Sequence, residues 1–275
     1  MYRGRFAPSP TGPLHFGSLV AALASYLDAR AGGGAWLVRI EDLDTPRNVP
    51  GAGDDILRTL EQFGFAWDEP VVWQSRRLEL YRAALDRLKA AGLAYPCSCS
   101  RRETGGGPYQ GTCRNGPRDP GHPLSWRVRA DDEDGDFIVR RSDGIFAYQL
   151  AVIVDDGAQG ITDVVRGADL LDSTPRQLHL QRLLSLPNPR YLHVPVAMNE
   201  AGEKLSKQNH APPLDSANPA RELREALRFL GQCDVDSVKP EEIIQEAIRN
   251  WDPEYFRSHA PSGSSACRAE ALPHD

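Results

Sequence analysis

Two short segments, far apart in the chain, carry residue types that bind a nucleotide. In residues 8–18 a loop rich in Pro and Gly leads to His15 and Gly17, where a helix is expected to begin. Free backbone N–H groups at a helix start bind phosphate, and glycine lets the backbone approach it closely. Residues 204–208 hold Lys204 and Lys207 in a chain with only four lysines. Lys207 can follow the charge that builds on a leaving pyrophosphate. Taken singly, the segments are better explained by a packing histidine and by a solvated loop; together they predict an ATP site.

A second set of residues suits a small acid that also carries an ammonium group. Arg5 ends the first expected strand, where its planar guanidinium can bind a carboxylate bidentately. Glu41 ends the second expected strand, at the sheet edge where open α/β folds bind ligands, and can take the ammonium. Tyr148 and Arg166 end later units and can close the same pocket. Each also has a purely structural interpretation: surface charge for the arginines, core packing for the tyrosine and a helix cap for the glutamate.

The cysteines suggest a metal site. Cys97, Cys99 and Cys113 fall within 17 positions, whereas the other two of the five cysteines are distant. Structural zinc takes four ligands, usually thiolates, so one ligand is missing. Spacing alone favours His122, because Tyr109 must lose a phenolic proton to bind. Three free thiols in a reducing compartment are the alternative.

Composition bounds the class of protein. The chain has 275 residues, 40% hydrophobic and 25% charged, as in ordinary globular proteins, and can form one large domain with appendages. It has no apolar run of about 20 residues and no signal sequence, so a cytoplasmic location without a membrane partner is expected. A net charge of −6 argues against non-specific coating of nucleic acid, while it leaves room for a local basic face.

The order of expected elements indicates a doubly wound parallel α/β fold of Rossmann type. A strand at 3–7, a helix capped by Ser18 and a strand at 35–40 form a βαβ unit. Helices are predicted at 54–63 and 76–91, followed by an irregular segment at 95–123. A βα alternation then resumes, with strands at 146–154, 161–165 and 193–198 and a helix at 174–186. Two more helices are predicted at 222–230 and 241–250. The corresponding division is 1–94 and 126–210 for the two halves of the catalytic domain, 95–125 for a zinc-binding insertion, 211–257 for a short helical subdomain and 258–275 for a disordered tail.

These motifs resemble those of a known family. Residues 15–18 and 204–208 resemble the His-Ile-Gly-His and Lys-Met-Ser-Lys-Ser signatures of class I aminoacyl-tRNA synthetases, and residues 5–12 and 39–47 resemble the glutamyl branch. The match extends from residue 3 to residue 208. Ser18 replaces a second histidine, as is common in that branch, and Gln208 replaces a final serine.

The resemblance implies the substrates and their sites. It implies that L-glutamate is activated by ATP with Mg²⁺, through attack of its α-carboxylate on the α-phosphorus. The implied catalytic residues are His15, Lys204 and Lys207. The implied ATP contacts are Pro8, Gly12, His15, Gly17, Ser18 and Lys207. The implied glutamate contacts are Arg5, Phe6, Ala7, Pro8, Ser9, Glu41, Tyr148 and Arg166.

The resemblance also bears on the metal and the acceptor. The Cys-x-Cys and Tyr-x-x-x-Cys pattern is similar to the zinc insertion of glutamyl-queuosine tRNA(Asp) synthetases, which implies a structural zinc on Cys97, Cys99, Tyr109 and Cys113. Fewer than 70 residues follow Gln208, too few for the helical anticodon-binding domain of a full glutamyl-tRNA synthetase. The expected partner is therefore tRNA(Asp) bearing queuosine, glutamylated at the wobble position by a monomer. The alternatives are a minimal glutamyl-tRNA synthetase that charges a 3′ end, a non-catalytic tRNA-binding module, and another nucleotidyltransferase.

Overall fold

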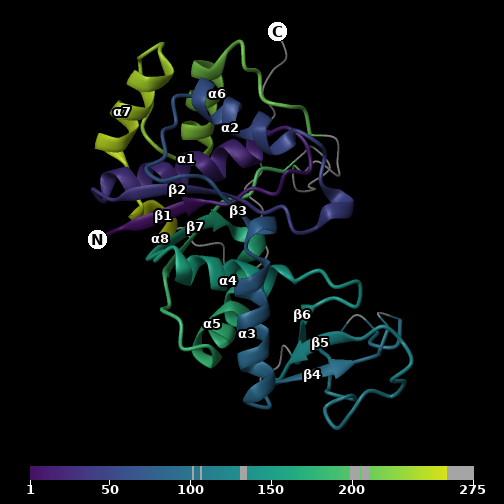
Figure 1. Ribbon diagram of the computed structural model, residues 1–275. Helices are drawn as coiled ribbons and strands as arrows, with labels where there is room; N and C mark the ends of the chain where they lie inside the picture. Colours follow the sequence, from purple (N-terminus) through teal and green to yellow (C-terminus); the bar gives the residue numbers. More distant parts are fainter. Residues whose placement is uncertain (101, 106, 131–134, 199–204, 206–210, 259–275) are drawn as a thin grey trace. The chain divides into compact units, whose positions relative to one another are not determined.

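The computed structural model describes residues 1–100, 102–105, 107–130, 135–198, 205 and 211–258 (Figure 1). The chain forms two compact units, and each is described separately. The first unit comprises residues 1–73, 161–171 and 189–275, and the second comprises 74–160 and 172–188. The finer five-part division made from composition stays a prediction. Across the described residues, no helix is long and apolar enough to cross a membrane.

The first unit contains parallel strands, as the sequence predicts. Its strands are β1 (Arg3–Phe6), β2 (Ala35–Ile40), β3 (Val72–Trp73), β7 (Asp163–Gly167) and β8 (Arg190–Val194). The pairs β1–β2, β2–β3 and β7–β8 are all parallel. Hydrogen bonds from Arg3 N to Thr162 Oγ1 (2.8 Å) and from Thr162 N to Arg3 O (3.0 Å) join β1 to the start of β7. The strands thus form two parallel sheets, in the orders β1-β2-β3 and β7-β8, and Thr162 at the start of β7 lies beside β1.

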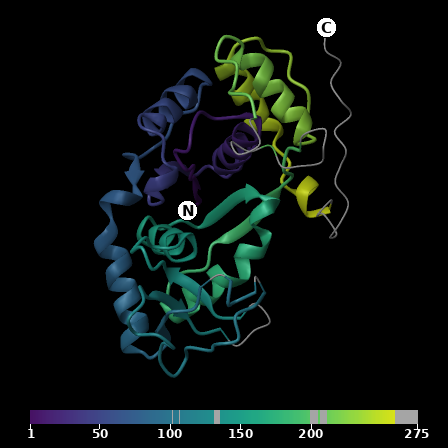
Figure 2. The same ribbon diagram turned by 90° about the vertical axis from the view of Figure 1, so that its right-hand side faces the viewer.

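Helix α1 (Phe16–Ala31) packs against these strands, which explains why its sequence is apolar on most sides. It contacts β1, β2 and β7, and it also contacts α6 (Pro219–Phe229) and α7 (Pro240–Asn250) (Figures 1 and 2). Such a helix has to bury nearly its whole circumference. Its N-cap is His15, not Ser18 as predicted, because Leu19 N already donates to His15 O at 3.0 Å. The unit is completed by η1 (Thr45–Arg47), α2 (Ala52–Gln62) and α8 (Glu254–Ser258).

The second unit combines helices with a separate antiparallel sheet. Its helices are η2 (Gln74–Arg76), α3 (Leu78–Ala90), α4 (Tyr148–Ala158) and α5 (Thr174–Leu183), and its strands are β4 (Ala94–Cys97), β5 (Ser125–Val128) and β6 (Phe137–Arg140), in that order in the sheet. The short 3-10 segment η3 (Ala168–Ser173) runs from the first unit into the second.

Two expectations about this unit were wrong or incomplete. Residues 146–154, read as part of a βα alternation, form most of helix α4, because a short buried apolar run looks alike in a strand and in a buried helix. Strands β4, β5 and β6 were not predicted, and β4 includes residues 95–97 of the segment that was expected to be irregular. The other predicted strands and helices are present with ends displaced by a few residues, as at 163–167 and 190–194.

A buried carboxylate fastens the helices of the second unit. Asp155 on α4 is fully buried. It accepts hydrogen bonds from Gln74 Nε2 (2.8 Å) and Tyr81 OH (2.7 Å), and it pairs with Arg77 Nε at 2.7 Å. A buried charge needs partners of this kind. The network joins η2, α3 and α4, and so sets the position of the helix that begins with Tyr148.

Candidate active site and metal centre

Three charged residues lie at the carboxyl ends of parallel strands in the first unit. Arg5 lies on β1, Glu41 directly follows β2, and Arg166 lies on β7. Their exposed fractions are only 4%, 9% and 4%. Parallel strands end at the same edge, so the strands themselves bring these groups to one side of the unit. The arginines are therefore not surface charges, which removes one of the structural interpretations of the sequence.

Arg39 is a functional candidate that sequence reasoning missed. Its side chain is fully buried, and its Nη2 lies 3.3 Å from Glu41 Oε1. The two residues are two positions apart, and alternate residues of an extended chain point to the same side. The only sequence signal is a charged residue inside an otherwise apolar strand. The pair fixes the orientation of the Glu41 carboxylate.

Arg166 is held by several groups around the end of β7. Its Nε donates to His193 Nε2 (3.4 Å), its Nη2 donates to Leu170 O (3.2 Å), and its guanidinium lies 4.9 Å from the centre of the Tyr191 ring. Burial, and then the Arg166 charge, lower the pKa of His193 to about 4. His193 is therefore neutral near pH 7, so its Nε2 can accept the hydrogen bond.

The loop between β1 and α1 is tied to the segment that follows β2. Glu41 N donates to Pro8 O, and Val49 N donates to Pro10 O, both at 2.9 Å. Gly12 has a φ of 140°, a backbone conformation that residues other than glycine rarely adopt. The loop thus has a defined path from the buried Arg5 to the beginning of α1.

The beginning of α1 meets the lysine segment. A Cβ placed on Gly17 would lie 3.3 Å from His15 Cε1 and 3.5 Å from Leu205 O. Leu205 N in turn donates to Ala197 O at 2.7 Å. Lys204, Lys207 and Gln208 lie outside the described residues, so their own contacts stay predictions. Leu205, the one described residue of 204–208, lies beside Gly17 at the beginning of α1.

The remaining predicted contacts differ in how far the structure describes them. The Phe6 ring stacks on Trp36 inside the core, so only its backbone is available to a ligand. Ser9 O accepts a hydrogen bond from Thr11 N within the loop, next to Ala7 and Pro8. Tyr148 is the first residue of α4, in the second unit, and its role in glutamate binding stays a prediction.

In the second unit the three cysteines come together with Tyr109. The Sγ atoms of Cys97, Cys99 and Cys113 lie within 4.8 Å of one another. Tyr109 OH lies 3.4 Å from Cys97 Sγ and 3.3 Å from Cys99 Sγ. Zn–S bonds of 2.3 Å in a tetrahedron place thiolates about 3.8 Å apart, so the cluster has the size that zinc requires. His122 lies elsewhere: its ring Nδ1 is 2.6 Å from Asp119 Oδ2 and its side chain is 71% exposed.

The pKa values of these groups are shifted in different directions. Burial alone would raise the pKa of the Cys113 thiol, but hydrogen bonds from Tyr109 OH and from backbone N–H groups bring it to about 6. Burial raises the pKa of the Cys99 thiol and, strongly, that of the Tyr109 phenol. Cys113 therefore loses its proton more readily than an ordinary thiol, whereas a metal would have to displace the proton of Tyr109.

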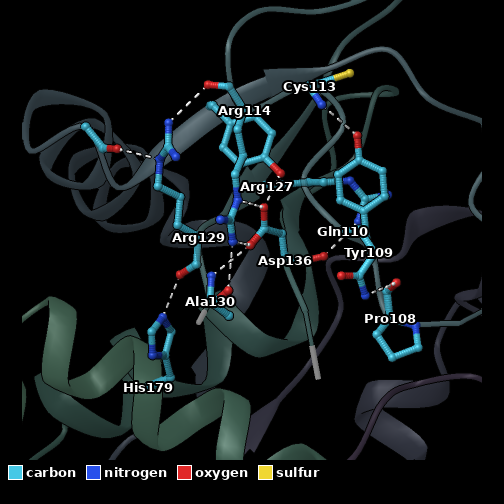
Figure 3. Close-up of polar contacts among 12 residues, drawn as sticks. Pro108, Tyr109, Gln110, Cys113, Arg114, Arg127, Arg129, Ala130, Asp136 and His179 are labelled. Carbon is cyan, nitrogen blue, oxygen red and sulfur yellow. Dashed lines mark hydrogen bonds and ion pairs between the residues drawn. The ribbon is translucent and has the colours of Figure 1, made fainter. Parts of the chain in front are cut away.

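Figure 3 shows the polar contacts beside this cluster, which the sequence did not reveal. Arg127 on β5 lies over the Tyr109 ring, and Asp136 lies close by. Asp136 accepts from Arg114 Nε (2.7 Å) and Nη2 (2.6 Å), from Ala130 N (2.9 Å) and from Tyr95 OH. Burial alone would raise the pKa of Asp136, but the Arg114 and Tyr95 hydrogen bonds hold it below its usual range.

Comparison with known proteins agrees with this geometry. Residues 1–105 and 118–247 match the family described as tRNA synthetases class I (E and Q), catalytic domain. The Glutamyl-Q tRNA(Asp) synthetase of Dechloromonas aromatica (strain RCB) is 59% identical over 84% of this chain and 86% of its own length. That of Aromatoleum aromaticum (strain DSM 19018 / LMG 30748 / EbN1) is 52% identical over 96% and 95%.

Solved structures give a similar result. The crystal structure of the glutamate-tRNA synthetase from Elizabethkingia anophelis superposes with a TM-score of 0.75 at 25% identity. The superposition covers 92% of this chain and 66% of that one, so the present chain spans about two thirds of that synthetase.

Proposed function

This chain belongs to the class I tRNA synthetases of the glutamyl and glutaminyl branch, and we propose that it activates L-glutamate with ATP and transfers the glutamyl group to queuosine at the wobble position of tRNA(Asp). The observation that carries the activation step is the set of buried charges at one sheet edge, next to the helix start where residues 15–17 meet Leu205. The acceptor is supported by the names of the relatives that match most of the chain.

The charges at the sheet edge complement glutamate. The substrate carries two carboxylates and one ammonium group, and the edge offers the guanidinium groups of Arg5 and Arg166 and the carboxylate of Glu41. In our proposal the arginines bind the carboxylates and Glu41 binds the ammonium group, with Arg39 behind it. Because all four side chains are at least nine-tenths buried, electrostatic contacts to them are screened little by water.

Activation then needs positioning more than acid–base chemistry. A carboxylate oxygen of glutamate bonds to the α-phosphorus of ATP, the bond to pyrophosphate breaks, and glutamyl-adenylate results. The attacking carboxylate is already ionised, so we assign His15, Lys204 and Lys207 to stabilising charge on the phosphates, as Mg²⁺ bound to ATP also would. In the second step a queuosine hydroxyl attacks the acyl carbon, loses its proton, and AMP leaves.

We assign the cysteine cluster to a structural zinc ion. Cys97, Cys99, Cys113 and Tyr109 supply four donors, which fill a tetrahedron and leave no position for a reactive water. Neither step of the proposed reaction requires such a water. The zinc would instead hold together a segment that has few apolar residues to bury.

Two assays test the proposal. Glutamate-dependent ATP–pyrophosphate exchange, with and without tRNA, tests activation; if no exchange occurs in either condition, the chain is a non-catalytic module. Transfer of labelled glutamate to queuosine-containing tRNA(Asp), queuosine-free tRNA(Asp) and tRNA(Glu) tests the acceptor. We expect label only on the first. Label on tRNA(Glu) alone would show a minimal glutamyl-tRNA synthetase.

A further inference from the structure

We propose that Arg127 is a positioning residue of the cysteine cluster, which holds Cys97 and Tyr109 in place and offsets part of the negative charge of the metal-bound ligands. This inference deepens the zinc site proposed above and rests on it. Arg127 is not one of the four donors. Its role follows from where its guanidinium lies.

The guanidinium contacts two of the four proposed ligands directly. Arg127 Nε donates to Cys97 Sγ at 3.4 Å, and the guanidinium carbon lies 4.0 Å from the centre of the Tyr109 ring (Figure 3). The planar group therefore uses its edge for the sulfur and its face for the ring. Cys97 ends β4, whereas Tyr109 belongs to the loop that follows, so one side chain fixes two separate segments.

Arg127 is itself held in place. It is only 7% exposed, and its Nη1 donates to the backbone oxygen of Asp136 at 3.1 Å. Asp136 in turn is fixed by the two hydrogen bonds from Arg114 and by the one from Ala130 N. A long side chain with this many contacts has little conformational freedom left. It can therefore act as a rigid wall of the site.

Charge gives the second reason for a cation at this position. Three thiolates and one phenolate around a divalent zinc ion carry two more negative charges than positive ones. An uncompensated charge in a buried site is costly, and a guanidinium in contact with two of the ligands removes half of that excess. A cation over the face of Tyr109 also stabilises the electron-rich ring of a coordinated tyrosine.

The insertion offers few other means of holding its ligands. The buried apolar cluster at this place comprises Tyr95, Cys97, Tyr109 and Cys113, with Cys99 packed against it. Most of that cluster consists of the ligands themselves, so polar contacts from outside must fix them. Partners of this kind change metal affinity by about 10- to 100-fold when they are removed.

Arg129, which directly follows the same strand, provides a matched control. Its guanidinium also lies over a tyrosine, Tyr95, at 5.4 Å, and its donors bind Gly92 O and Arg114 O, each at 3.0 Å. Arg127→Met removes the charge and the N–H donors but keeps a side chain of similar length. Arg127→Lys keeps the charge without the planar group. Arg129→Met removes a neighbouring arginine for which the described contacts include none of the four ligands.

The experiment measures zinc content and the rate at which zinc passes to a chromogenic chelator in the full chain. We expect zinc to leave Arg127→Met about 10- to 100-fold faster than wild type, Arg127→Lys to be intermediate, and Arg129→Met to match wild type. In the cobalt-substituted protein, Arg127→Met should shift the visible ligand-field bands, whereas Arg129→Met should not.

A second measurement separates a positioning role from general stabilisation of the sheet. Each variant is melted with zinc and after chelation, and the zinc-induced rise in Tm is compared. A general effect lowers both Tm values equally; a positioning role reduces the rise itself. A rise in Arg127→Met equal to that of wild type, or an equal rate of zinc release, overturns this inference alone. Absence of zinc from the wild-type protein overturns the metal site and this inference with it.

Discussion

The sheet edge of the first unit and the cysteine insertion of the second both bury charged groups, but they hold them by different means. Behind the sheet edge lies a continuous apolar cluster, to which α1 contributes Leu19, Leu23 and Leu27 and the strands contribute Phe6 and Trp36. Among its described residues, the insertion contributes the small buried cluster of Tyr95 and the proposed ligands. At the sheet edge the apolar core holds the site residues in position, whereas in the insertion the proposed metal ligands themselves make up most of the buried cluster.

This difference has consequences for mutation. Where an independent core fixes the backbone, removing a charged side chain should abolish chemistry and leave the fold intact. Where the functional groups are themselves the buried contacts, losing one should loosen the structure first. The following predictions test this difference by mutations in both regions.

The largest effect is expected at Arg5. Arg5→Met keeps volume but removes the guanidinium proposed to bind a glutamate carboxylate. We expect glutamate-dependent pyrophosphate exchange to fall about a thousandfold, equivalent to about 4 kcal/mol, because a buried pair of charges is lost. The Tm and zinc content should stay close to those of wild type. Arg3→Met is the control, since Arg3 lies at the other end of β1 and pairs with Glu69 at 2.7 Å. Exchange in Arg5→Met at the level of Arg3→Met would refute the role.

Removing a thiolate should have the opposite pattern. Cys113→Ser is expected to lose zinc and about 3 kcal/mol of stability, the linkage free energy for a metal a few hundred-fold above its Kd. The measurements are zinc content and unfolding by urea with and without chelator. Cys233, which is exposed, supplies the control Cys233→Ser. The contrast between the regions fails if Cys113→Ser reduces exchange as much as Arg5→Met does while unfolding like wild type.

The two regions also differ in how much of their structure could be predicted from the sequence. Helix α1 was predicted because Leu19, Leu23 and Leu27 recur every four residues. Strand ends indicated where Arg5 and Glu41 lie, whereas their role in glutamate binding came from the resemblance and stays a prediction. Such local signals are sufficient when the core is built from regular elements. They did not distinguish the buried helix α4 from a strand.

The insertion could not be read in this way. Spacing favoured His122 as the fourth ligand, but in the structure the His122 ring contacts Asp119. The phenol of Tyr109 instead lies beside the thiols, and the Tyr109 backbone forms an isolated β-bridge with Gly135. The resemblance to known zinc insertions pointed to the tyrosine where spacing did not. Arg39 was missed although it is the charged residue of an otherwise apolar strand, and Arg127 was missed because its segment shows no pattern that marks it as buried.

Removing the carboxylate of Asp136, which contacts Tyr95 and Arg114 of the insertion, should cost more stability than removing a carboxylate at the surface. Asp136→Asn removes the charge that pairs with Arg114 in a buried position, and we expect a loss of about 2 kcal/mol. Asp143→Asn is the control: Asp143 pairs with Arg141, but both side chains are over 40% exposed, so the loss should stay below about 0.5 kcal/mol. Urea unfolding of the zinc-loaded proteins gives both values. Equal losses would mean that the Asp136 contacts do not support the insertion.

The smallest effect concerns pH at the sheet edge. The pKa of His193 is about 4 in the folded protein, below its usual 6.5, because of burial and Arg166. Between pH 6.5 and 4 the unfolded chain binds this proton and the folded chain does not, so stability falls as pH falls and is unaffected above that window. Since His193 is only half-buried, we expect a loss of about 1 kcal/mol. His193→Gln cannot take up the proton, and carboxylates titrate alike in both proteins, so the difference between their stability curves isolates this residue. If the two curves run parallel from pH 6.5 to 4, the hydrogen bond from Arg166 to a neutral His193 is not part of what holds that arginine at the edge of the sheet.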